Sequence, residues 1–156
     1  MKTKTYRAAG GVVIDAHGRV LLIERDVTRN NAPVHEVRLP KGHVEEGESD
    51  LDAAIRETCE ESGYCDLSFF ADLGEARSEY DHKGKHYIRD EHYYLLRLRS
   101  TTHRDPDVDP DSEEALFHST WAESLSAAQS RLSYPTEIEF ARRAQAWLQQ
   151  SHQSAQ

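Results

Sequence analysis

GHVEEGESDLDAAIRETCEESGY, residues 42–64, predicts a glycine-punctuated loop that leads into a helix. Ser49 is a good N-cap, and Asp50 and Asp52 follow in the first turn, where the positive end of the helix dipole favours carboxylates. Gly63 suits the left-handed residue that often ends a helix. We therefore expect a helix that starts at Ser49 and stops at Gly63.

One face of this expected helix is apolar and another is acidic. The apolar positions recur with helical spacing and predict a stripe that packs on a core, namely Leu51, Ala54, Ile55, Thr58 and Cys59. Glu57, Glu60 and Glu61 fall together on a different face, although like charges at this spacing repel and the helix dipole disfavours acids in the last turn. The cluster is either a solvated acidic face or a site for a hard divalent cation, whose preferred ligands are oxygens.

The full spacing resembles the Nudix box, G-x5-E-x7-R-E-U-x-E-E-x-G-U, in which U is a bulky aliphatic residue. Every fixed position is matched, by Gly42, Glu48, Arg56, Glu57, Glu60, Glu61 and Gly63. The two U positions carry Thr58 and Tyr64, a departure that touches packing and not the charged groups. A pattern of this length in a loop-to-helix context is highly specific, so the chain is identified as a member of the Nudix (MutT-like) family.

The resemblance implies an α/β fold, an α/β/α sandwich with a mixed β-sheet. It also implies an enzyme, a pyrophosphohydrolase that cuts a pyrophosphate bond in a nucleoside diphosphate derivative with Mg²⁺ or Mn²⁺ as cofactor. The metal ligands would be Glu57, Glu60 and Glu61, helped by a backbone carbonyl at Lys41 or Gly42.

The same resemblance assigns the catalytic roles. Arg56, Glu57 and Glu60 are the expected catalytic residues of the box, with Arg56 orienting the glutamates. Relatives take the proton of the attacking water either with a box glutamate or with an acid on a distal loop. Glu113 and Glu114 are the distal candidates here, and they are equally well explained as two solvated loop acids.

Substrate choice depends on residues outside the box. Residues 38–45, RLPKGHVE, resemble the LPKGHVE run of Nudix enzymes that act on dinucleoside polyphosphates such as diadenosine tetraphosphate, or on diphosphoinositol polyphosphates. Members of the first group often carry a tyrosine shortly after the box. Tyr80 occupies that place and either stacks on a base or is an ordinary strand or loop residue. Arg38, Lys41 and Lys85 are the cations expected to bind the substrate.

We therefore expect a hydrolase of dinucleoside polyphosphates. The alternatives are a hydrolase of diphosphoinositol polyphosphate, of a modified nucleoside triphosphate or of ADP-ribose, and, from another class, a nucleotide sensor without catalysis. Family members of the sensor type usually have damaged boxes, whereas the charged box residues are all present here.

Composition limits the partners. The 156 residues fit a single domain, expected at 1–150 with a polar tail at 151–156, and the net charge of -9 argues against a nucleic-acid partner. We see no signal-peptide pattern and no apolar run long enough to span a bilayer, so we expect a cytoplasmic protein with a small-molecule substrate and no membrane partner. The sequence leaves monomer and homodimer equally open.

The remaining expectations concern cysteines and secondary structure. Cys59 and Cys65 lack C-x-x-C spacing, so we expect neither a structural disulfide nor a zinc site. The patterns predict strands at 6–14, 19–25, 34–39, 65–73, 86–99 and 115–121, and further helices at 122–129 and 135–150. Polar segments predict loops at 26–33 and 101–114, and the polar stretch 77–85 predicts a turn around His82, Lys83 and Gly84. Gly74 predicts a bend or bulge.

Overall fold

Apolar segments of the chain form a seven-stranded sheet in the computed structural model, which describes residues 1–154. The strands are β1 (Lys2–Ile14), β2 (Val20–Arg29), β3 (Ala32–Arg38), β4 (Lys41–His43), β5 (Leu67–His82), β6 (Lys85–Leu98) and β7 (His118–Ala122). Their order is β3-β2-β1-β6-β5, with β4 paired to β1 and β7 to β2. Because β1 and β6 run parallel and the other pairs run antiparallel, the predicted mixed sheet is confirmed.

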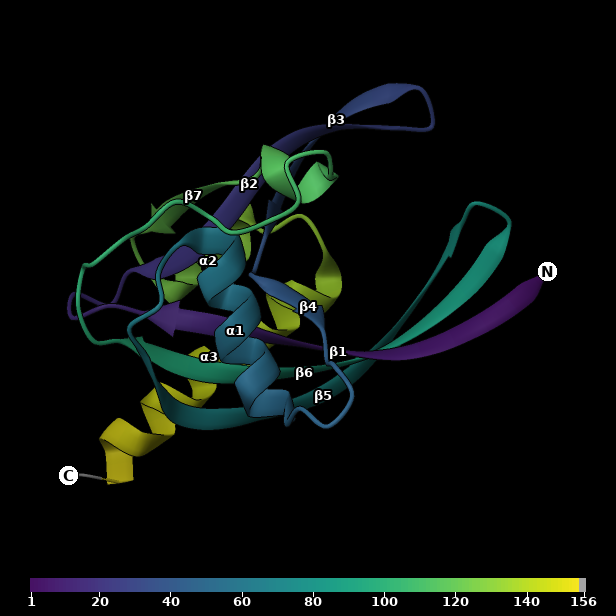
Figure 1. Ribbon diagram of the computed structural model, residues 1–156. Helices are drawn as coiled ribbons and strands as arrows, with labels where there is room; N and C mark the ends of the chain where they lie inside the picture. The colour runs from purple at the N-terminus through teal and green to yellow at the C-terminus, as the bar shows by residue number, and fades with distance from the viewer. Residues whose placement is uncertain (155–156) are drawn as a thin grey trace.

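Helices cover both faces of this sheet (Figure 1). Successive residues of β1 point to opposite faces, as the pleat requires. Ala9 and Val13 pack with helix α1 (Asp50–Ser62), whereas Val12 and Ile14 belong to the core under α2 (Leu125–Arg131) and α3 (Pro135–Ser154). The α/β/α sandwich is therefore confirmed.

Helix α1 begins and ends where the sequence predicts. The Ser49 side chain accepts a hydrogen bond from the Asp52 amide, and Gly63 takes the left-handed conformation with φ 83° while its amide bonds the Cys59 carbonyl. Both caps satisfy backbone groups that a helix end otherwise leaves unpaired. No helix of the described residues is long and apolar enough to cross a membrane.

One predicted loop is wrong, and one predicted turn is confirmed. Residues 26–33 are mostly strand, because β2 runs on to Arg29 and turns through Asn30 and Asn31, both with positive φ, into β3. Asparagine tolerates this conformation better than most residues, so the Asn-Asn pair is a turn signal that the prediction missed. The turn predicted around His82, Lys83 and Gly84 is confirmed, and the polar residues 77–82 that lead to it belong to β5.

Smaller differences lie in the second half of the chain. The predicted irregularity at Gly74 is confirmed, since the β5–β6 register shifts between Asp72 and Glu75. A short 3₁₀ helix, η1 (Glu113–Leu116), stands where the strand at 115–121 was predicted to begin. Helix α3 continues through 151–154, part of the predicted polar tail, and the rest of that tail lies outside the described residues.

The prediction of no disulfide is also wrong. Cys59 and Cys65 are bonded, with their Cα atoms 4.4 Å apart. Gly63 reverses the chain at the end of α1, which returns Cys65 to the side of the last helical turn. A left-handed helix cap therefore brings two cysteines together without C-x-x-C spacing.

Candidate active site

The close approach of β4 to α1 explains the glycine at position 42. A Cβ atom built on Gly42 would collide with the carboxyl group of Glu57. A larger residue would displace this carboxyl group, so the contact with Glu57 needs glycine, although φ at position 42 is not positive. This contact places the carboxylate of Glu57 against the backbone of the residue predicted to supply a metal-binding carbonyl.

One guanidinium joins the loop to the acidic face of α1. Arg56 donates to both carboxylate oxygens of Glu48 at 2.8 and 3.0 Å and to the His43 carbonyl at 2.9 Å. It also donates to Glu57 at 2.8 Å and to Glu60 at 3.2 Å. The structure thus brings Arg56 together with two of the three predicted metal ligands, in the arrangement that an orienting role needs.

The third predicted ligand, Glu61, is buried beside β4. Its carboxylate accepts a hydrogen bond from the Lys41 amide at 2.7 Å. Burial raises the pKa of Glu61, and burial also raises the pKa of Glu57 although the neighbouring Arg56 opposes that effect. Two acids of the cluster are therefore held where a negative charge is poorly solvated.

These groups fit a hard divalent cation. All are oxygen donors, and a nearby cation would offset the cost of ionising Glu57 and Glu61. A different group, Asp50, Glu75 and His92, has ligand atoms within 4.8 Å of one another. We do not assign a metal there, because Arg7 already donates to Asp50 at 2.5 Å and to Glu75 at 2.7 Å.

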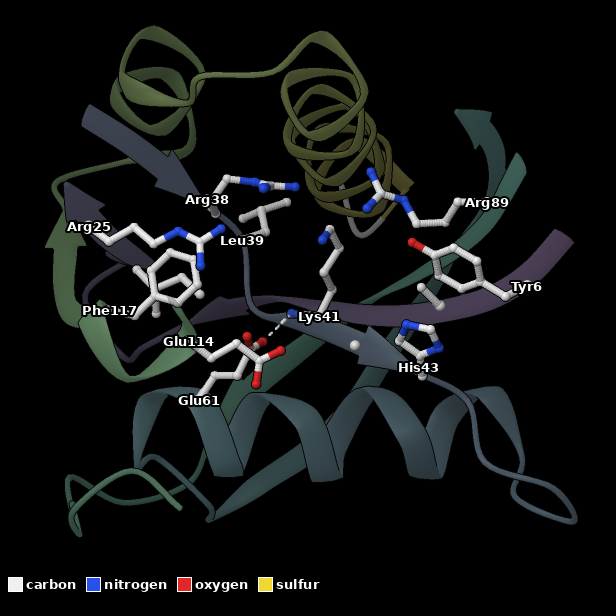
Figure 2. A pocket seen from close by; sticks show the side chains of 13 residues that line it. Tyr6, Arg25, Arg38, Leu39, Lys41, His43, Glu61, Arg89, Glu114 and Phe117 are labelled. Carbon is white, nitrogen blue, oxygen red and sulfur yellow. Dashed lines mark hydrogen bonds between the residues drawn. The ribbon is translucent and has the colours of Figure 1, made fainter. Parts of the chain in front are cut away.

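A pocket of about 180 Å³ lies beside the box, and its charged lining residues are the acids Glu61 and Glu114 and the cations Arg25, Arg38, Lys41 and Arg89. Figure 2 shows Glu61 and Glu114 on the side of α1, and the heads of Arg38, Lys41 and Arg89 on the side of α3. Ile23, Leu39 and Phe117 add apolar surface. A polyphosphate that spans this pocket would meet Arg38, Lys41 and Arg89 at one end and the candidate metal ligand Glu61 at the other.

The three cations on the side of α3 differ in how firmly they are held. Arg38 donates to Glu137 at 2.7 Å, and Arg89 donates to Ser78 at 3.1 Å. The Lys41 ammonium makes no ion pair within 4.0 Å among the described residues, and burial lowers its pKa. Lys41 is therefore the cation of the pocket most in need of an anionic partner.

The structure separates the two distal acids. Glu114 lines the pocket and faces Glu61 (Figure 2). Glu113 instead forms an ion pair with Arg29 at 2.9 Å on the surface. Of the two, only Glu114 is close enough to the box for the role predicted of a distal acid.

A wider groove of about 660 Å³ adjoins the pocket and contains Tyr80. The Tyr80 and Tyr87 rings stack with centroids 5.1 Å apart, and the Tyr80 hydroxyl lies 2.7 Å from that of Tyr6. Tyr6 also stacks on His43 at 4.3 Å, and these two residues line both the groove and the pocket. An aromatic surface thus continues directly from the charged pocket.

One residue predicted for the substrate site lies outside it, and several residues of the site were not predicted. Lys85 lies at the tip of the β5–β6 hairpin, opposite Lys2, and lines neither cavity. Tyr6, Arg25, His43 and Phe117 were not singled out, because their proximity depends on strand pairing between distant segments. The only local signal was the position of His43 directly after the box glycine.

Comparison with known proteins shows the family. The NUDIX domain model matches residues 4–144. An RNA pyrophosphohydrolase from Bartonella tribocorum is 40% identical over 67 residues, which are 40% of this chain and only 39% of that enzyme.

Two solved structures share the fold. A NUDIX hydrolase from Nitrosomonas europaea superposes with a TM-score of 0.64 at 21% identity, covering 92% of this chain and 90% of that one. The C. elegans Ap4A hydrolase superposes with a TM-score of 0.61 at 26% identity, covering 93% of this chain and 99% of that one.

Proposed function

The chain belongs to the NUDIX domain family, and from that premise we propose that it hydrolyses a pyrophosphate bond in a nucleoside diphosphate derivative. One observation carries the proposal: Glu61 of the box and Glu114 lie on one side of a pocket, and the heads of Arg38, Lys41 and Arg89 lie on the other (Figure 2). Phosphoryl transfer needs positioning and charge neutralisation more than covalent help from the protein, and this division of charge provides for both.

The box supplies the proposed metal site. Glu57, Glu60 and Glu61 would hold Mg²⁺ or Mn²⁺ together with the backbone carbonyl of Lys41 or Gly42. When bound, the cation supplies charge neutralisation on the phosphate oxygens and makes water a better nucleophile. Arg56 orients Glu57 and Glu60 through the hydrogen bonds that join it to them.

The general base is proposed among acids that reach the pocket. Glu114 is favoured over Glu113, because Glu113 is paired with Arg29 at the surface. Glu57 is the alternative within the box, since its raised pKa suits a group that accepts and releases a proton.

The preferred substrate class is the dinucleoside polyphosphates. The pocket is small and charged, whereas the adjoining groove is larger and aromatic. We propose that phosphates bind along Lys41, Arg38 and Arg89, and that a nucleoside base lies in the groove with Tyr80 as a stacking surface. The C. elegans Ap4A hydrolase, which shares the fold over nearly its whole length, supports this choice.

The test is product formation from a panel of compounds, separated by anion-exchange chromatography, with and without magnesium. The panel holds diadenosine tetraphosphate, ADP-ribose, 8-oxo-dGTP, a diphosphoinositol polyphosphate and an RNA with a 5′-triphosphate. We expect magnesium-dependent cleavage of diadenosine tetraphosphate to ATP and AMP. Preferential cleavage of another compound would overturn the proposed substrate class. Cleavage of none of them would favour a nucleotide sensor without catalysis.

The metal assignment is tested by Glu60→Gln. This change keeps the shape of the side chain and removes its charge, so kcat should fall by about a hundredfold or more. The matched control is Asp52→Asn, an exposed acid in the first turn of the same helix. Wild-type turnover by Glu60→Gln would remove this glutamate from the metal site.

The base-binding role of Tyr80 is tested by Tyr80→Ala. Loss of a stacking surface should raise KM for diadenosine tetraphosphate by about tenfold, with a smaller effect on kcat. Phe69→Ala is the control, because Phe69 is an exposed aromatic residue of the same strand that does not line the groove. An equal KM for both variants would leave Tyr80 without a role in binding.

A further inference from the structure

We propose that Glu137, in the first turn of α3, is a positioning residue that fixes the segment leading into the active site. This segment, Arg38–Gly42, joins β3 to β4 and carries Lys41 and Gly42 to the box. The inference rests on the proposed function for its kinetic consequences. Its structural claim, that one side chain of α3 sets the geometry of β4, does not.

The carboxylate of Glu137 holds two consecutive residues. One oxygen accepts the Leu39 amide at 2.6 Å and the other accepts the Arg38 guanidinium at 2.7 Å. Glu137 is 1% exposed and Arg38 lies beside the same helix (Figure 2). Bonds of this kind to a charged group are stronger than neutral ones, and they are little screened where water is excluded.

The held residues lie in a gap between two strands. β3 ends at Arg38 and β4 begins at Lys41, so the sheet ladder does not include Leu39 and Pro40. Proline has no amide hydrogen. The Glu137 carboxylate is therefore the hydrogen-bond partner of the one amide in this gap, and the Pro40 carbonyl accepts a hydrogen bond from the Gly11 amide at 3.1 Å.

The gap leads directly to the candidate metal ligands. Two residues after Leu39, the Lys41 amide donates to Glu61 at 2.7 Å. The next residue, Gly42, is in contact with the carboxyl group of Glu57. A shift of the gap segment would therefore move both contacts, and misplacements of about 1 Å can cost about a hundredfold in rate.

Packing alone does not account for a carboxylate at this position. The residues that follow on the same face of α3 are apolar and fully buried, namely Phe140, Ala141 and Ala144. A buried ion pair is often no more stabilising than a well-packed apolar pair, so Glu137 is a local exception of the kind found where function sets the residue.

The test compares Glu137→Gln with Glu139→Gln. Glu139 lies two residues along the same helix, is partly exposed and pairs with Arg142 and Arg143, so it controls for loss of an α3 carboxylate. Hydrogen exchange is measured at the Leu39 and Lys41 amides, Mn²⁺ affinity by calorimetry, and kcat and KM on the active substrate of the panel.

For Glu137→Gln we expect amide exchange about tenfold faster at both positions, weaker Mn²⁺ binding, and kcat lowered by about tenfold with KM changed less. Values within twofold of those of Glu139→Gln would overturn the proposal, and so would a loss of kcat with unchanged exchange. If Glu137→Gln does not fold, Glu137→Asp, which keeps the charge and shortens its reach, is read by the same criteria. If the wild-type protein cleaves no compound of the panel, the proposed function is wrong. Amide hydrogen exchange and Mn²⁺ affinity still test the role of Glu137 in that case.

Discussion

At position 42, a hydrogen atom in place of a methyl group decides whether Glu57 can occupy its site. The sequence identifies this glycine only through a pattern, and the structure gives the reason, since the carboxyl group of Glu57 fills the space of a Cβ atom. The same reasoning does not apply to Gly18, where a Cβ atom meets nothing within 4 Å but φ is +78°.

Gly42→Ala should therefore damage catalysis, whereas Gly18→Ala should damage only stability. We expect kcat of Gly42→Ala to fall by about a hundredfold, because the methyl group displaces a proposed metal ligand. Gly18→Ala should lower the free energy of unfolding by about 1 kcal/mol through backbone strain, with kcat unchanged. Kinetics and thermal unfolding of both variants distinguish the two effects, and a wild-type kcat for Gly42→Ala would contradict the contact.

A second prediction concerns Glu61, which is buried with a raised pKa. In the metal-free protein near neutral pH, ionisation of this group opposes folding. Glu61→Gln keeps an oxygen for the Lys41 amide and removes the charge. With EDTA present, we expect a higher Tm than that of the wild type, together with loss of turnover when magnesium is restored. A lower Tm for Glu61→Gln in EDTA would show that the carboxylate is not held at a cost.

At the scale of elements, α1 could be predicted from sequence and the long hairpins could not. Ser49 and Gly63 are local signals whose effect depends on few neighbours. The outer half of β5 is polar, and it is a strand only because β6 pairs with it along its length. The pairing of β1 with β6 is parallel and joins segments far apart in the chain. The contact between Tyr6 and Tyr80 therefore could not be predicted from any local sequence pattern.

The Cys59–Cys65 bridge at the end of α1 leads to a prediction about the unfolding temperature. It closes a loop of sequence separation 6 that contains Glu60 and Glu61. Constraint of the unfolded chain by so short a loop is worth about 2 kcal/mol. The variant with both cysteines changed to serine should therefore unfold about 4–8 °C below the oxidised protein.

Two controls isolate the bridge. Tris(2-carboxyethyl)phosphine should lower the Tm of the wild type and leave the Tm of the serine variant unchanged. Intact mass should be two hydrogens lower in the oxidised wild type than after reduction. Free thiols at both positions in air-oxidised protein would contradict the bond.

At the scale of the whole molecule, one network joins the N-terminal end of α1 to three strands. His92 of β6 bonds Asp50 of α1 at 2.8 Å and Asp72 of β5 at 2.7 Å. The hydroxyl of Tyr94 lies 3.3 Å from the His92 ring. Arg7 of β1 extends the network by bonding Asp50 and Glu75. No sequence pattern could indicate it, because its members come from four elements.

The network should set the pH dependence of stability. Burial lowers the pKa of His92, but the bonds to Asp50 and Asp72 outweigh it, so the pKa is raised above 6.5. The bond from Arg7 lowers the pKa of Asp50 below 3.8. The contribution of His92 is complete below pH 6.5 and is lost as the pH rises through its raised pKa. That of Asp50 is complete above pH 3.8 and is lost as the pH falls. The network is therefore strongest between these two values.

We expect the Tm of the metal-free wild-type protein to decline as the pH rises above 6.5 and through the raised pKa of His92, where this histidine releases its proton. His92→Gln should flatten this decline. His35→Gln is the matched control, because His35 also bonds two carboxylates, Glu24 and Asp26, but lies exposed on the β2–β3 hairpin. Solvent screens exposed pairs, so His35→Gln should leave the decline nearly intact. If the two variants flatten the profile equally, the effect belongs to histidine charge in general, and the network adds no stability of its own.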